Sequence, residues 1–247
     1  MWIKCIGFDT DGVIVNSDPI HYKAFNIVLK NNHFPKIGGR KYYEKYLAYD
    51  DKNFFSEYLK EINKSRPTKE EIARLVDEKS KEFKQLIKKN PLKFYPGIQE
   101  LIRSISKEKI LFDVTGSDKD SINTIFRKGG IDKCFDVIVT SEDVNKPKPS
   151  PEPYLKAFEY LKKKNGLKPY ECIVTEDSRD GILSAKGAGF YTIGVTNTSK
   201  EEDLWSAGAD LVFDKLNVNI YNRLIQIEKR PTSKLELLDL FSEFLPN

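Results

Sequence analysis

Five short apolar runs constrain the fold of this chain more than any other feature. They are IKCIGF (3–8), ILFDV (110–114), FDVIVT (135–140), ECIVT (171–175) and YTIGVT (191–196), and LVF (211–213) is a candidate sixth. Nearly continuous apolar runs are typical of strands that helices cover on both faces, as in a parallel sheet. Helix-like segments lie between them at 97–107, 151–164 and 180–188. The alternation predicts an α/β fold with a doubly wound parallel sheet.

The interval between the first two strands is about a hundred residues, which is too long for one crossover helix. Its pattern is helical and rich in lysine and glutamate, with helices expected at 19–31, 40–63 and 68–89. Prolines and a glycine near 90–97 mark the return to the sheet. We therefore expect a core domain of residues 1–15 and 95–247 and an inserted α-helical domain of residues 16–94.

Composition argues against several classes of protein. The 41 Lys and Arg and 37 Asp and Glu residues give a formal charge of +4 and alternate along the chain, so we expect no nucleic-acid partner. No apolar run approaches the ~18 residues of a membrane span, and the first residues lack a secretory signal pattern. The three cysteines are widely spaced and form no CxxC, which favours reduced thiols in a cytoplasmic protein.

Polar residues follow four of the predicted strands. The segments are Asp9-Thr10-Asp11-Gly12, Thr115-Gly116-Ser117, Lys146-Pro147-Lys148-Pro149 and Glu176-Asp177-Ser178. In an open parallel sheet, ligands bind at the carboxyl ends of the strands, near a switch in strand order. We therefore expect carboxylates, hydroxyls and a lysine to meet at one edge of the sheet.

This set of groups points to one kind of chemistry. Several carboxylates in one cleft repel one another unless a cation is present. Because no His or Cys accompanies them, the all-oxygen set suits magnesium (Mg²⁺) better than zinc. A hydroxyl, backbone amides after a glycine and a lysine form a receptor for phosphate. Together they predict phosphoryl transfer, with a carboxylate available as the nucleophile.

The segment GFDTDGVIVNSDPIHYKAF (7–25) resembles the first motif of the haloacid dehalogenase superfamily, in its branch with a helical cap after the first strand. VTGS (114–117), KPSPEPY (148–154) and TEDSRDGILSAKGAGF (175–190) resemble the remaining motifs, in order, and the resemblance extends to about Leu224. It implies a Rossmann-like core with an inserted α-helical cap, and a Mg²⁺-dependent phosphatase that acts through an aspartyl-phosphate. A phosphomutase of the β-phosphoglucomutase type and a catalytically idle binding protein remain as alternatives.

The resemblance also implies roles for four acidic residues. Asp9 matches the nucleophile, which also binds the metal. Asp11 matches the general acid and base, and its backbone carbonyl matches a metal ligand. Asp177 matches a direct metal ligand, and Glu176 matches a ligand that acts directly or through water.

The phosphate-binding residues follow from the second and third motifs. Thr115 and the amide of Gly116 would hold phosphate oxygens, and Lys148 would offset the phosphate charge. Lys146 competes for that role, but the motif favours Lys148. For Ser117 we expect a cap on the following helix instead of a phosphate contact.

Residues of the inserted domain are candidates for substrate contact. His21 lies on its first helix, where the family counterpart often faces the active site, and Asp51 either contacts the substrate or caps a helix. No second phosphate site is evident in the cap, which favours hydrolysis over mutase activity. The expected partner is a small-molecule phosphate ester, and the expected state is a monomer or weak dimer.

Two positions depart from the usual pattern of these motifs, and the tail of the chain lies beyond them. Thr10 occupies a position where the family commonly has a larger apolar residue, and Asp180 adds a carboxylate near the metal loop. The apolar spacing in the tail, 229–247, predicts one amphipathic helix. Its apolar side would carry Leu235, Leu238, Phe241 and Leu245.

Overall fold

The structure, a computed structural model, describes residues 2–47, 49–63 and 67–244. The chain divides into two compact units. The core comprises Met1–Asn16 and Lys93–Asn247, and the cap comprises Ser17–Leu92. No helix in the described ranges has the length and apolar composition that crossing a membrane requires.

The core is built on one sheet of six parallel strands in the order β3-β2-β1-β4-β5-β6. The strands are β1 (Cys5–Phe8), β2 (Ile110–Val114), β3 (Val137–Val139), β4 (Cys172–Glu176), β5 (Tyr191–Val195) and β6 (Leu211–Phe213). This arrangement confirms the predicted α/β fold class and the candidate sixth strand. The strand order reverses direction after β3, because β4 returns to pair with β1.

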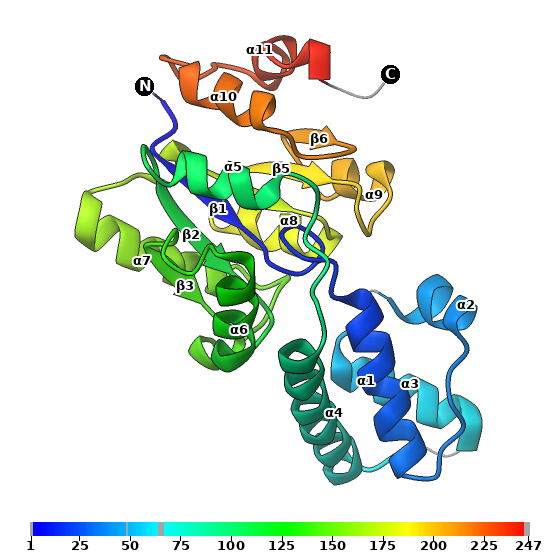
Figure 1. Ribbon diagram of the computed structural model, residues 1–247. Coiled ribbons are helices and arrows are strands. Elements are labelled where there is room, and N and C mark those ends of the chain that lie inside the picture. Colours follow the sequence, from blue (N-terminus) through cyan, green and yellow to red (C-terminus); the bar gives the residue numbers. More distant parts are fainter. Residues whose placement is uncertain (1, 48, 64–66, 245–247) are drawn as a thin grey trace. The chain divides into compact units, whose positions relative to one another are not determined.

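Helices cover both faces of this sheet (Figure 1), which explains why the strands are apolar throughout. One face carries α7 (Glu152–Asn165), α8 (Arg179–Gly187) and α9 (Glu201–Ser206), and the other carries α5 (Ile98–Ile105), α6 (Lys119–Gly129) and α10 (Val218–Gln226). Tyr154 of α7 packs on the first face with Phe112 and Val174. On the second face, Phe8 contacts Tyr221 of α10.

Strand register brings three strand ends to one level. Phe8 at the end of β1 pairs with Asp113 in β2 and with Thr175 in β4. The residues just beyond these partners are therefore neighbours across the sheet, as the polar strand ends in the sequence predict.

The cap consists of helical segments around an aromatic core. They are α1 (Asp18–Asn31), α2 (Gly39–Lys41), a π-helical turn η1 (Tyr42–Tyr46), α3 (Asp51–Asn63) and α4 (Lys69–Lys89). The single helix predicted over 40–63 is wrong: the chain starts a new helix at Asp51, and the Asp50 carboxylate accepts a hydrogen bond of 2.7 Å from the Asn53 amide. Thr68 caps α4 by accepting from the Glu71 amide at 3.1 Å.

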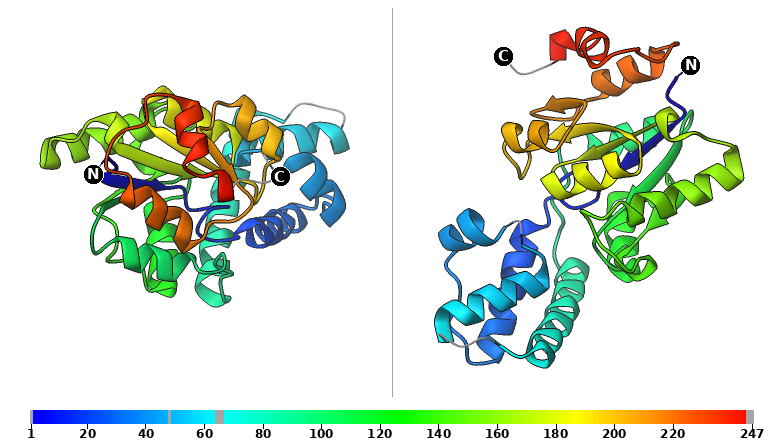
Figure 2. Two further views of the ribbon diagram at one scale, coloured as in Figure 1. Left: turned by 90° about the horizontal axis from the view of Figure 1, so that it is seen from above. Right: turned by 180° about the vertical axis from the view of Figure 1, so that it is seen from behind.

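The single helix predicted over the tail is also wrong. After α10 the chain passes through Pro231 and restarts as α11 (Lys234–Asp239), which Ser233 caps, followed by a 3-10 turn, η4 (Ser242–Phe244). Leu235 is 70% exposed, whereas Phe241 is buried against Phe213 of β6. Figure 2 shows α10 and α11, in orange and red, lying beside this edge of the sheet. Leu245 lies outside the described residues.

Candidate active site

The turn after β1 carries Asp9 and Asp11. The carbonyl of Thr10 accepts hydrogen bonds from the amides of Ile14 and Val15 at 2.9 and 3.0 Å, which closes the turn. Gly12 has φ +80°, and a Cβ there would lie 1.8 Å from Oδ2 of Asp177. Only glycine fits this position, because it tolerates the left-handed backbone and leaves room for the carboxylate.

Lys148 joins three strand ends with one ammonium group. Its Nζ lies 2.6 Å from Oδ1 of Asp9, 2.7 Å from Oε1 of Glu176 and 2.8 Å from the carbonyl oxygen of Val114. Lys146 is exposed instead. The structure thus places Lys148, and not its competitor, among the carboxylates.

Three buried carboxylates form a group that could hold a cation. Asp9, Glu176 and Asp177 each offer an oxygen, and these oxygens lie within 4.8 Å of one another. The donors in this group are all carboxylate oxygens, which fits a hard divalent cation. The carboxylate of Asp11 lies apart from this group, where its Oδ2 accepts a hydrogen bond from the Ser117 hydroxyl at 3.0 Å.

The electrostatics of the group favour a bound cation. Burial raises the pKa of Asp9 well above its usual range, Lys148 opposes the rise, and Glu176, Asp177 and Asp11 add to it. Burial alone would lower the pKa of Lys148, but the charges of Asp9 and Glu176 outweigh burial and raise it. One lysine therefore does not compensate for all the negative charge, and a divalent cation would relieve the remainder.

The loop after β2 supplies hydroxyls and an open backbone. Thr115 is 4% exposed, and its Oγ1 accepts from the Ser117 amide at 3.1 Å. A Cβ at the exposed Gly116 would meet nothing within 4 Å. The prediction that Ser117 caps α6 is wrong, because Asp118 is the cap and accepts from two amides of the first turn. Ser117 contacts Asp11 instead.

Sequence reasoning missed three residues that contact the site. The Thr198 hydroxyl donates to Oδ2 of Asp177, and the side-chain amide of Asn197 donates from Nδ2 to the carbonyl of Gly12 at 2.7 Å. The Tyr154 hydroxyl donates to Oε1 of Glu176. A signal was present for the first two, because GVTNT follows the fifth strand and the carboxyl ends of parallel strands meet at one edge.

In the cap, the two candidate residues share one buried lysine. Lys79 is 3% exposed, and its Nζ lies 2.6 Å from Oδ1 of Asp51 and 2.7 Å from Nδ1 of His21. Burial and the charge of Lys79 lower the pKa of His21 well below its usual range. Lys79 was detectable as a lysine on the apolar stripe of α4, but its partners were not.

Comparison with known proteins decides the family. The model of the family described as haloacid dehalogenase-like hydrolase matches residues 6–195 of this chain, which is most of its length. The chain belongs to the haloacid dehalogenase-like hydrolases. The resemblance seen in the motifs and the enzyme class that it implies are confirmed.

Relatives in this hydrolase family include phosphatases and a mutase. The chain is 25% identical to a phosphorylated carbohydrates phosphatase of Thermotoga maritima, over 84% of this chain and 92% of the relative. It is 26% identical to the β-phosphoglucomutase of Bacillus subtilis, over 85% and 88%. It is 29% identical to the bifunctional riboflavin kinase/FMN phosphatase of Arabidopsis thaliana, over 88% of this chain and 55% of the relative.

A solved structure shares the fold of this hydrolase. The structure of CbbY from Rhodobacter sphaeroides in complex with phosphate aligns with a TM-score of 0.71 and 26% identity. The alignment covers 86% of this chain and 94% of CbbY.

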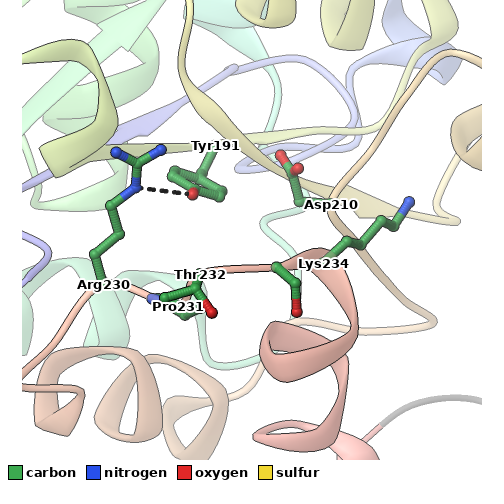
Figure 3. Close-up of a pocket in the computed structure, with 7 residues that line it drawn as sticks. Tyr191, Asp210, Arg230, Pro231, Thr232 and Lys234 are labelled. Atoms are coloured by element: carbon green, nitrogen blue, oxygen red, sulfur yellow. Dashed lines mark hydrogen bonds between the residues drawn. The ribbon is translucent and has the colours of Figure 1, made fainter.

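A cavity of about 500 Å³ lies elsewhere in the core of this hydrolase. Tyr191 at the start of β5, Asp210 before β6, and the segment Arg230–Lys234 line it (Figure 3). Arg230 donates to the Tyr191 hydroxyl at 3.2 Å. This cavity is at the amino ends of the strands, so it is separate from the carboxylate group.

Gly181→Ala is expected to destabilise the protein. Gly to Ala in a helix usually stabilises by roughly 0.5–1 kcal/mol. Here a Cβ would lie 1.9 Å from Oε2 of Glu176, so the carboxylate must move, at a cost of about 1–3 kcal/mol. Urea unfolding measures the change. Gly39→Ala is the matched control, because its Cβ would meet only the Tyr22 hydroxyl oxygen at 3.7 Å and the ring carbon that bears it at 3.9 Å. An unchanged stability of Gly181→Ala would contradict the position of Glu176.

Proposed function

We propose that this hydrolase is a Mg²⁺-dependent phosphatase that cleaves a small phosphate ester through an aspartyl-phosphate. The observation that carries the proposal is the position of Lys148 between Asp9 and Glu176, with its ammonium group bound to the carbonyl of Val114 just before the Thr115–Ser117 loop. Such a site offers a carboxylate as nucleophile and a lysine to bind the phosphate. It also offers hydroxyl and amide groups that can donate hydrogen bonds to the phosphate. The family and its phosphatase relatives support the same reaction.

In the first half of the proposed reaction, an oxygen of Asp9 attacks phosphorus and the bond from phosphorus to the ester oxygen breaks. Asp11 gives a proton to that departing oxygen, which leaves as an alcohol. Lys148 and the amide of Gly116 bind the phosphate oxygens and stabilise their negative charge. Asp9, Glu176 and Asp177 would hold the Mg²⁺, which when bound supplies further positive charge.

In the second half, a water molecule attacks phosphorus and Asp11, now a carboxylate, takes its proton. The bond from phosphorus to the Asp9 oxygen breaks, which releases inorganic phosphate and restores the carboxylate. Ser117 donates to Asp11 and thereby holds its carboxylate in one direction during both proton transfers.

A phosphomutase is the second candidate, and similarity to the β-phosphoglucomutase of Bacillus subtilis supports it. The two functions differ in their product. A phosphatase releases inorganic phosphate, whereas a mutase converts a sugar 1-phosphate without net release. The remaining properties stay predictions from the sequence: a cytoplasmic location, a small-molecule phosphate ester as the partner, and a monomer or weak dimer.

The proposal predicts that phosphate release from p-nitrophenyl phosphate depends on Mg²⁺. EDTA is expected to lower the rate at least about 10²-fold, because the carboxylates then repel both one another and the substrate. Excess Mg²⁺ added afterwards should restore the rate, which controls for damage by the chelator. Mg²⁺ should also raise the melting temperature, since it binds the folded state.

If EDTA does not change the rate of phosphate release, the proposed dependence on Mg²⁺ is refuted. No release, together with conversion of a sugar 1-phosphate, would favour the mutase. If the protein shows neither activity, the remaining alternative is a binding protein on the same fold.

A further inference from the structure

A buried polar pair lies beneath the turn that carries Asp9 and Asp11. Thr10 and Asp113 are both 0% exposed, and the Thr10 hydroxyl donates to Oδ1 of Asp113 at 2.8 Å. Among the described residues, Oδ2 of Asp113 has no hydrogen-bond partner. Burying a carboxyl group with a single hydrogen bond is costly, and two apolar side chains would fill the same space without that cost. The pair is therefore not needed for packing.

The pair holds the backbone between the two catalytic carboxylates. The Thr10 carbonyl accepts from the amides of Ile14 and Val15, while its hydroxyl is tied to β2 through Asp113. Side chains alternate in an extended segment, so Thr10 points away from the side of Asp9 and Asp11. A rotation of the backbone at Thr10 would redirect both carboxylates.

The charge state of Asp113 suits a role in holding the turn. Burial raises the pKa of Asp113 to about 8, and the hydrogen bond from Thr10 opposes the rise. At neutral pH the group is therefore mostly a neutral acid. It adds little negative charge behind Asp9, Glu176 and Asp177, which already repel one another.

We propose that Thr10 and Asp113 are positioning residues for the phosphoryl transfer proposed above, on which this inference rests. Their hydrogen bond fixes the turn so that Asp9 faces Lys148 and Asp11 faces Ser117. Neither residue touches the substrate. The pair occupies a place where an apolar contact would stabilise the fold but would not fix the rotation of the backbone.

Three variants separate positioning from stability. Thr10→Val removes the hydroxyl at nearly constant volume, Thr10→Ser keeps it, and Thr10→Val/Asp113→Val replaces the whole pair with apolar groups. Thr10→Val is expected to lower kcat by about 10–100-fold with KM changed less than about threefold, because small displacements of catalytic groups cost this much. Thr10→Ser should keep kcat within about threefold of wild type. The double variant should regain the melting temperature lost in Thr10→Val, but not kcat.

Thr192→Val is the matched control. Thr192 is also 0% exposed, and its hydroxyl donates to Oδ2 of Asp210 at 3.2 Å at the amino end of β5. The Thr192→Val variant therefore removes a similar buried hydrogen bond, far from the strand ends that carry the site. We expect a lower melting temperature and an unchanged kcat.

The double variant decides the inference even if Thr10→Val does not fold. If it has both the melting temperature and the kcat of wild type, the pair is structural and the inference is overturned. If wild type itself releases no phosphate, the proposed function fails. The inference is then tested by comparing how much Mg²⁺ raises the melting temperature of wild type and of the double variant. A smaller rise in the double variant supports it, and an equal rise, or no rise in wild type, overturns it.

Discussion

Asp9→Asn is expected to lower phosphate release at least about 10³-fold, since loss of a catalytic nucleophile removes the covalent route altogether. An amide is isosteric with the carboxylate but is a poor nucleophile. The initial rate with p-nitrophenyl phosphate at saturating Mg²⁺ measures the loss. Asp132→Asn, an exposed residue of the same type, is the control and should keep the wild-type rate.

The Asp9→Asn protein should fold as well as wild type. Burial and the neighbouring carboxylates raise the pKa of Asp9, which means that its negative charge is unfavourable in the folded state. A neutral amide removes part of that repulsion, so the melting temperature should stay the same or rise. If Asp9→Asn keeps more than about a tenth of the wild-type rate, water attacks phosphorus directly and no aspartyl-phosphate forms.

Lys148→Met is expected to lower phosphate release by about 10²–10³-fold and also to destabilise the protein. The lysine side chain is 15% exposed, and it is the ion-pair partner of both Asp9 and Glu176. Removing one partner of a buried ion pair costs on the order of 3–5 kcal/mol, because the remaining charge is buried without compensation. Urea unfolding and initial rates check the two effects. Lys146→Met, which removes an exposed lysine two residues away, should change neither.

The stability lost in Lys148→Met should depend on pH. Without the ammonium group, the folded-state pKa of Asp9 rises further above its unfolded value. A carboxyl group of this kind contributes stability below its unfolded pKa and loses that contribution as pH rises through its folded pKa. The difference in unfolding free energy between wild type and variant should therefore shrink from pH 8 to pH 5. A difference that stays constant over this range would contradict the ion pairs.

The sequence predicted those parts of the fold and site that depend on local patterns. Buried parallel strands are continuous apolar runs, and polar residues at strand ends must meet once the strands are parallel. Cross-chain partners have no such local pattern. Ser117 and Asp118 are adjacent and both can cap a helix, and only the course of the loop decides that Asp118 caps while Ser117 contacts Asp11.

The predictions that were wrong over 40–63 and 229–247 have a common cause. Apolar spacing shows which residues can share a helix face, but not whether one helix runs through them. In both segments an acidic or hydroxyl residue, Asp50 or Ser233, accepts from amides of a new first turn and starts a separate helix. Tertiary packing then selects the buried side, as the exposure of Leu235 shows.

The spread of the site along the chain has a consequence for its synthesis. The contact of Lys148 with Asp9 spans 139 residues, and that of Asn197 with Gly12 spans 185. During translation, Asp9 leaves the ribosome long before the lysine that neutralises it, and Asp177 before the hydroxyl of Thr198. A nascent chain that stops short of Thr198 thus carries Asp177 without the hydroxyl that donates to it. The candidate active site is complete only when most of the core has been made.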